Sequence, residues 1–173
     1  AGVIAQNLVS FPSGLFFGDK MQFWGVAGRD GMWYLALTEE LKNNFPPLNP
    51  SFSGELLKNY HYFYYLAQAE ISRLTAIPVI DINFRFFPIF VSITFGLSIY
   101  LLIKKITKNN SAAYWALFFA FFSGSFGYIP RLLGYGRGGW ETVFWSMQPF
   151  SMLQNPQLGF SFVLLVVWLI FLI

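Results

Sequence analysis

The chain of 173 residues has no cysteine, one histidine and few charges. The lack of cysteine excludes disulfides, zinc–thiolate sites, iron–sulfur clusters and cysteine catalysis within this stretch. The single histidine, His61, excludes a cage of several histidines around a metal. Charged residues make up 11%, against about a quarter in an ordinary soluble domain. The net charge of +3 is spread along the chain, so nucleic-acid binding is not indicated.

Apolar and aromatic side chains are abundant instead, at 55% and 21% of residues. Such a chain cannot cover itself with polar surface, so lipid is its natural solvent. Long apolar runs cover residues 84–103, 112–129 and 159–173. About 20 helical residues cross the hydrocarbon core, so the first run is long enough and the second nearly so. The sequence predicts an all-α, polytopic bundle of transmembrane helices, and we expect the third run to continue in a longer protein.

The loop at 104–111 contains three lysines and no acid. Short basic loops stay on the cytoplasmic side of a membrane. This pattern places 104–111 in the cytoplasm and places 1–83 and 130–158 outside, in a multi-pass protein of the plasma membrane. The transmembrane region is expected at 84–173.

Residues 1–83 are not a membrane span, because charges interrupt them every few positions. A first amphipathic helix is predicted at Asp30–Asn43, where Trp33, Leu37 and Leu41 recur at four-residue spacing. Prolines in the following segment end that helix.

A second amphipathic helix is predicted at Tyr60–Ile77. One face carries Phe63, Ala67, Ile71 and Leu74, and the other carries Tyr64, Gln68 and Ser72. Helices of this kind lie along a membrane surface or against a helical bundle.

Asp30 is the acid that we single out, in the run GRDGMWYLAL. Gly28 and Gly31 leave its carboxylate little shielded, so it can approach a metal ion, a phosphate-bound metal or an attacking hydroxyl. The alternative is that Asp30 is the N-cap of the helix that follows. The two roles are compatible.

Glu141 lies in the second outer loop, which is rich in glycine and also contains Arg131 and Arg137. The arginines are suited to an anionic phosphate. The alternative is that Glu141 pairs with one of them or caps a short helix. The run lacks the GK[ST] ending of a nucleotide-binding loop.

His61 and Tyr60 belong to an aromatic block, YHYFYY. An imidazole can bind phosphate, hold a metal or transfer a proton near neutral pH, and aromatic faces can stack on a sugar ring. The alternative is an aromatic belt at the level of the lipid headgroups. The apolar runs have no Asp, Glu, Lys or His in their interiors, so polar chemistry is left to the outer loops.

The order of these features, with the segment NFPPLNPSFSGELLKNYHYFYY, resembles the GT-C class of polytopic glycosyltransferases, which includes protein mannosyltransferase and oligosaccharyltransferase-like membrane proteins. The resemblance implies transfer of a sugar from a polyprenyl-phosphate donor to an acceptor on the outer face. Asp30 would then be the general base or a ligand of a divalent metal such as Mg²⁺ or Mn²⁺, with Asp19 as a second candidate acid. Glu141 would bind that metal or position the substrate.

The same resemblance implies that Arg131, Arg137 and His61 stabilise the departing lipid phosphate and that Tyr60 contributes to substrate binding. Two other functions are compatible with the sequence. One is a transporter or flippase of lipid-linked intermediates, and the other is a non-catalytic membrane assembly protein.

Overall fold

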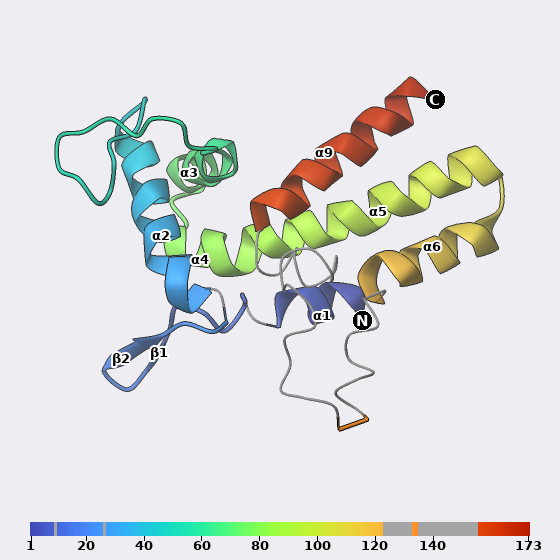
Figure 1. Ribbon diagram of the computed structural model, residues 1–173, viewed down its shortest axis with the longest axis horizontal. Coiled ribbons are helices and arrows are strands. Elements are labelled where there is room, and N and C mark those ends of the chain that lie inside the picture. The colour runs from blue at the N-terminus through green and yellow to red at the C-terminus, as the bar shows by residue number, and fades with distance from the viewer. Residues whose placement is uncertain (9, 26, 123–132, 135–155) are drawn as a thin grey trace. The chain divides into compact units, whose positions relative to one another are not determined.

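The computed structural model describes residues 1–8, 10–25, 27–122, 133–134 and 156–173. The described chain is mostly helical, which confirms the all-α part of the expected fold (Figure 1). It divides into two compact units. One unit is Asn7–Phe90, and the other joins Ala1–Gln6 to Val91–Ile173.

In the unit Asn7–Phe90, helices α2 (Ala27–Asn43) and α3 (Phe63–Thr75) pack against each other. Both also contact the short helix α4 (Val79–Asp81) and α3 contacts the π-helical turn η1 (Ile82–Phe86). The two helices lie where the apolar periodicity predicted them, although α2 begins three residues earlier and α3 is shorter at both ends. Leu37 and Leu41 of α2 are fully buried in this packing.

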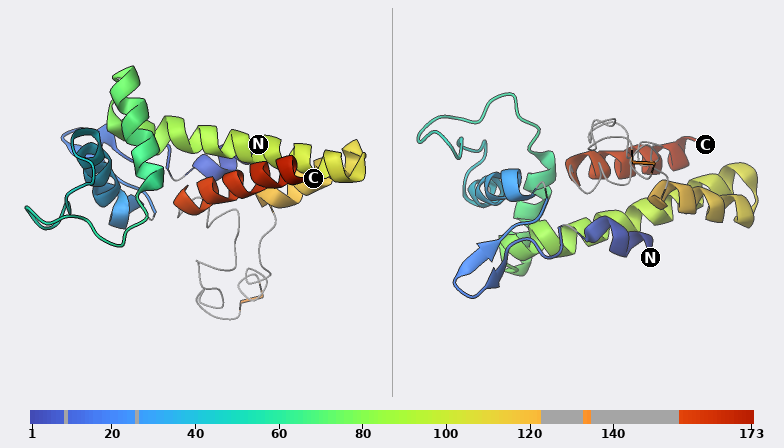
Figure 2. Two further views of the ribbon diagram at one scale, coloured as in Figure 1. Left: turned by 90° about the horizontal axis from the view of Figure 1, so that it is seen from above. Right: turned by 60° about the horizontal axis from the view of Figure 1, so that its bottom comes forward.

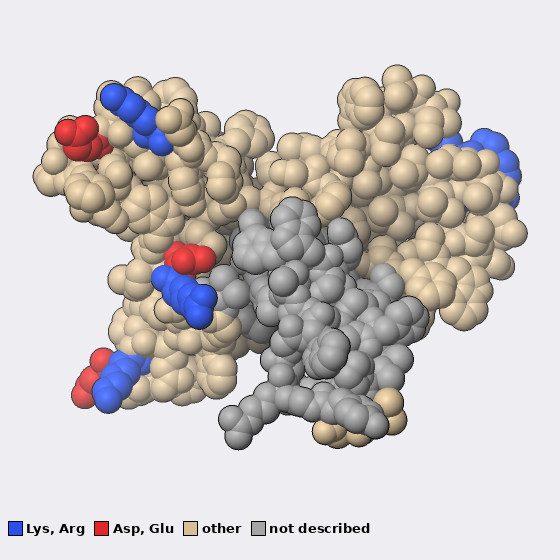
Figure 3. Space-filling model, in the orientation of Figure 1, with Lys and Arg blue, Asp and Glu red and all other residues tan. Residues whose placement is uncertain are grey.

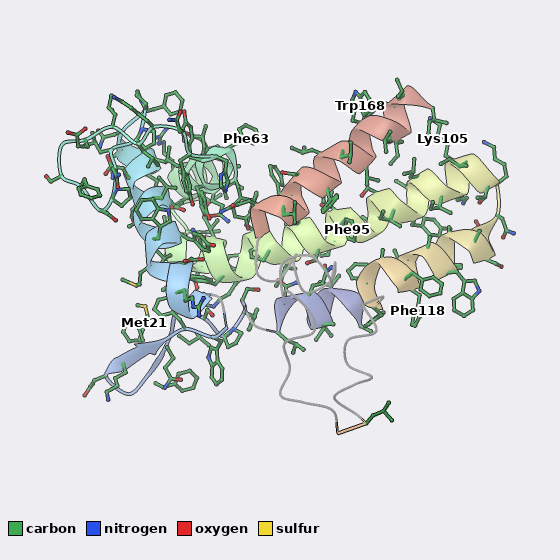
Figure 4. All side chains as sticks on the ribbon, in the orientation of Figure 1. Met21, Phe63, Phe95, Lys105, Phe118 and Trp168 are labelled. Atoms are coloured by element: carbon green, nitrogen blue, oxygen red, sulfur yellow. The ribbon has the colours of Figure 1, made fainter. Side chains whose placement is uncertain are left out.

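The buried face of α3 is the one that carries Tyr64, Gln68 and Ser72. Phe63 and Leu74, on the more apolar face, are exposed. Phe63 is labelled on α3 in Figure 4. The Tyr64 ring packs edge-on against Phe87, with 5.0 Å between ring centroids. Ser72 is satisfied locally, because its hydroxyl donates to the Ile77 carbonyl at 2.8 Å. The polar stripe is therefore the packing surface of this helix.

A short antiparallel hairpin, β1 (Leu15–Phe17) and β2 (Lys20–Gln22), precedes α2. Its two-residue turn has Gly18 first, at φ +62°, where glycine is favoured. At its base, a Cβ on Gly14 would lie 2.7 Å from the Ile80 side chain, so the hairpin packs closely on α4. Three-residue strands are too short to show an alternating pattern, and the sequence did not indicate them.

The longest helix runs without interruption over Val79–Thr107, through α4, η1 and α5 (Phe87–Thr107). Within the part of the chain that the structure describes, it is the one helix long and apolar enough to cross a membrane. Its 29 residues extend about 43 Å. Pro88 lacks an N–H, and a local π-helical turn such as η1 lets a helix accommodate proline. The span expected at 84–103 lies within this helix.

In the other unit, α5 from Val91 onward and α6 (Asn110–Phe122) form an antiparallel helical hairpin, as both further views show (Figure 2). The unit also contains α9 (Pro156–Leu172) and α1 (Gly2–Asn7) apart from the last residue of α1. Within the described residues, helices α6 and α9 are apolar but shorter than a full span. Phe121 of α6 packs edge-on against Phe95 of α5 at 5.9 Å, beside Gly96, where a Cβ would lie 2.9 Å from the Phe121 ring.

Candidate functional site

Asp30 lies in the first turn of α2 and is exposed. Because α2 begins at Ala27, Asp30 is the fourth helical residue, and its interpretation as the N-cap is wrong. An acid in the first turn is still favourable, since it faces the positive end of the helix dipole. The carboxylate is thus held on a regular helix and open to solvent.

The glycine after Asp30 has a packing role. Gly31 is buried, and a Cβ there would lie 3.0 Å from the Phe23 ring and 3.3 Å from the Phe84 ring. Phe23 and Phe84 also pack edge to face, with 5.8 Å between centroids. Only glycine allows both rings to close on α2 without displacement. Gly31 therefore fixes the turn that carries Asp30. The sequence had suggested a different role for this glycine, namely to leave the Asp30 carboxylate unshielded.

Tyr34 is the direct partner of Asp30. Its hydroxyl donates to Asp30 Oδ2 at 3.3 Å, one helical turn along the same face. Burial raises the pKa of Tyr34 well above its usual value, and the negative charge of Asp30 raises it further. Tyr34 thus remains a protonated donor, and it orients the carboxylate without removing its capacity to accept another proton.

Aromatic rings connect Tyr34 to the second helix. Tyr34 stacks on Tyr65 at 5.2 Å, Tyr65 on Tyr60 at 6.5 Å, and Tyr60 on His61 at 4.7 Å. Trp33 closes the group, because its Nε1–H donates to the Tyr60 hydroxyl at 3.1 Å. We call these five residues, Trp33, Tyr34, Tyr60, His61 and Tyr65, the aromatic cluster. His61 is exposed at one end of it, and Asp30 lies at the other.

Hydrogen bonds, one buried and the others partly buried, connect α2 and the hairpin base to η1. The Asn83 amide of η1 donates to Thr38 Oγ1 at 2.9 Å, and the Thr38 hydroxyl donates to the Tyr34 carbonyl at 2.7 Å. Arg85, also in η1, pairs with Asp81 at 2.6 Å and donates to the Ser13 carbonyl at 3.2 Å. The π-helical turn therefore ties both α2 and the hairpin base to the start of the long helix.

Three of the residues singled out from the sequence, Asp30, Tyr60 and His61, are thus brought into one array. Arg131, Arg137 and Glu141 lie outside the described residues. The alternative acid Asp19 is exposed in the hairpin turn and is not a member of the array.

The donor set for a divalent metal is incomplete in the described chain. Asp30 supplies one carboxylate, with the Tyr34 hydroxyl beside it. No group of three His, Asp or Glu side chains that could hold a metal ion occurs among the residues described here. Glu141, the second expected ligand, falls in the part that is not described, so these residues alone do not fit a metal site.

No protein-family model, curated protein or solved structure matches the chain.

The sequence did not single out Tyr34, Tyr65, Thr38 or Asn83. Tyr34 carried a usable signal, because a tyrosine four residues after an acid on a helix faces that acid. Tyr65 and Asn83 carried none, since their roles depend on how α3 and η1 pack against α2.

Proposed function

We propose that this protein is an integral membrane glycosyltransferase of the GT-C type, which transfers a sugar from a polyprenyl-phosphate donor to an acceptor on the outer face of the membrane. The observation that carries the proposal is the pairing of one exposed acid, Asp30, with an array of aromatic rings and hydroxyls. Aromatic faces suit the apolar faces of a sugar ring, and hydroxyls and a carboxylate suit its hydroxyl groups.

In the proposed reaction, the acceptor hydroxyl oxygen attacks the anomeric carbon of the donor sugar. The new carbon–oxygen bond forms as the bond from that carbon to the phosphate oxygen breaks, and the electron pair leaves with the polyprenyl phosphate. Asp30 accepts the proton of the acceptor hydroxyl. Tyr60 and His61 hold the sugar, and His61, Arg131 and Arg137 offset the charge of the leaving phosphate.

The membrane location has a physical basis in the same chain. A donor with a polyprenyl tail is confined to the bilayer, and Val79–Thr107 is long enough to cross one. We propose that α6 and α9 are further spans of a multi-pass protein of the plasma membrane, with the aromatic cluster outside and 104–111 in the cytoplasm. Glu141 would then assist Asp30 from the second outer loop.

Asp30→Asn tests the catalytic proposal. Asparagine keeps the size of the side chain and an oxygen that can accept from Tyr34, but it cannot take up a proton. We expect sugar transfer to fall by roughly 100-fold or more, because general-base catalysis contributes about that factor. The measurement is transfer of radiolabelled sugar from synthetic polyprenyl-phosphate monosaccharides by the complete protein in membranes, at matched protein levels.

Asp19→Asn is the matched control, because it makes the same chemical change at another exposed acid of the same unit. We expect it to retain transfer. Full activity of Asp30→Asn would refute the role of Asp30, and loss of activity in Asp19→Asn alone would assign the role to Asp19 instead.

A further inference from the structure

An apolar groove of about 520 Å³ runs between α5 and α6. Its lining is contributed by these helices and by one residue of α1: Val3, Ser92, Ile93, Gly96, Leu97, Tyr100, Tyr114, Leu117 and Phe121. From Ser92 to Tyr100 the groove follows about 12 Å of helix. That length matches a substantial part of one acyl chain.

One end of the groove is polar. Tyr100 and Tyr114 both line it and lie 5.4 Å apart between ring centroids. The Tyr100 hydroxyl donates at 3.4 Å to Oδ1 of Asn110, the first residue of α6. The Lys104 ammonium lies 5.7 Å from the centre of the Tyr100 ring. The Lys104 ammonium therefore lies at the polar end of this apolar groove.

The charge at this end is of one sign. Lys104, Lys105 and Lys108 lie in or next to the turn and are exposed. No Asp or Glu occurs in Ala1–Gln6, 91–122 or 156–173, which are the described parts of this unit apart from 133–134. Figure 3 shows basic side chains at this end of the α5–α6 hairpin (compare Figure 1) and no acidic ones beside them. Lys105 donates to the Ile170 carbonyl of α9 at 2.7 Å, which leaves Lys104 and Lys108 to meet a ligand.

We propose that this groove binds one anionic phospholipid, with an acyl chain against Ile93, Gly96 and Leu97 and the headgroup phosphate at Lys104 and Lys108. Charge complementarity favours the anionic headgroup, because the lysines meet no carboxylate in the described unit. Tyrosines at the junction are suited to the boundary between acyl chains and headgroups. The inference rests on the proposed membrane location and is independent of sugar transfer.

The test is lipid retention by the full chain, purified in a neutral detergent and examined by native mass spectrometry. The probes are palmitoyl-oleoyl phosphatidylglycerol, phosphatidylcholine with the same acyl chains, and glycerol phosphate, which lacks acyl chains. We expect one phosphatidylglycerol to be retained in preference to phosphatidylcholine, and we expect no retention of glycerol phosphate.

Two variants locate the site. Lys104→Gln with Lys108→Gln should weaken binding of phosphatidylglycerol by about 30-fold, given the contribution of each lysine near an anionic headgroup. Leu97→Trp should also reduce binding, because the new ring fills the groove from an exposed position.

Each variant has a matched control. Lys58→Gln removes an exposed lysine of the other unit, and Leu101→Trp places the same ring on α5 outside the groove lining. Both should bind like the unmodified chain. Equal retention of the two phospholipids, or unchanged binding in the lysine and Leu97 variants, would overturn the proposal, as would a helix of the same protein occupying the groove.

Discussion

Tyr34 and Tyr64 each have a pKa raised clearly above the usual value near 10. Burial is the main cause at both residues, because the ionised phenolate would lose its hydration. At Tyr34 the adjacent Asp30 carboxylate adds to this effect. A folded protein that keeps these protons above pH 10 must release them when it unfolds.

This difference predicts a loss of stability in alkaline solution. Above about pH 10 the unfolded chain has given up the Tyr64 proton and the folded chain has not, so stability falls by up to about 1.4 kcal/mol per pH unit from this group. Tyr64→Phe removes the group, and its thermal midpoint should fall less steeply with pH than that of the unmodified protein. Circular dichroism melts across this pH range provide the measurement, and identical slopes would contradict the assignment.

Asp30, Tyr60 and His61 were predicted as site residues from their residue types and from their neighbours in the sequence. The sequence could not predict that they meet. About thirty residues separate Asp30 from Tyr60, and their association depends on α2 packing against α3 and on the Trp33–Tyr60 hydrogen bond. The catalytic and binding roles of these residues stay predictions.

At the scale of elements, apolar periodicity located α2 and α3, because both are long enough to show a helical repeat. It could not locate β1 and β2, which have three residues each, or the π-helical turn, which has no periodic signal. On α3 the periodicity distinguished two faces, but it could not predict which face packs against the rest of the unit. That choice depends on neighbours such as Phe87, which lie elsewhere in the chain.

Two leucines test this packing with one chemical change. Leu41 of α2 is 0% exposed, and Leu74 of α3 is 83% exposed. Leu41→Ala should lower the free energy of unfolding by about 2–5 kcal/mol, because it leaves a cavity in the α2–α3 interface. Leu74→Ala should change it by no more than about 0.5 kcal/mol.

Denaturant titration of the full chain measures both leucine variants. A similar loss of unfolding free energy in both variants would mean that Leu74 is buried, which would contradict its exposure in the structure.

At the scale of the whole molecule, composition predicted a helical membrane protein, and the described chain contains one helix long and apolar enough to cross a bilayer. The multi-pass arrangement stays a proposal, because α6 and α9 are shorter than a full span. In that proposal the basic turn at 104–111 is cytoplasmic and the aromatic cluster is outside. If Val79–Thr107 crosses the membrane, residues beyond its two ends face opposite compartments.

The membrane crossing by Val79–Thr107 can be tested by cysteine labelling, because the chain has no cysteine of its own. Single cysteines are introduced at Phe52, which is exposed in the loop before α3, and at Lys108, which is exposed in the turn after α5. A membrane-impermeant maleimide is then added to intact cells and to permeabilised cells. We expect Phe52→Cys to react in intact cells and Lys108→Cys to react only after permeabilisation. Reaction of both from the same side would contradict a membrane crossing by Val79–Thr107, and reaction of Phe52→Cys only after permeabilisation would contradict an outward-facing Asp30.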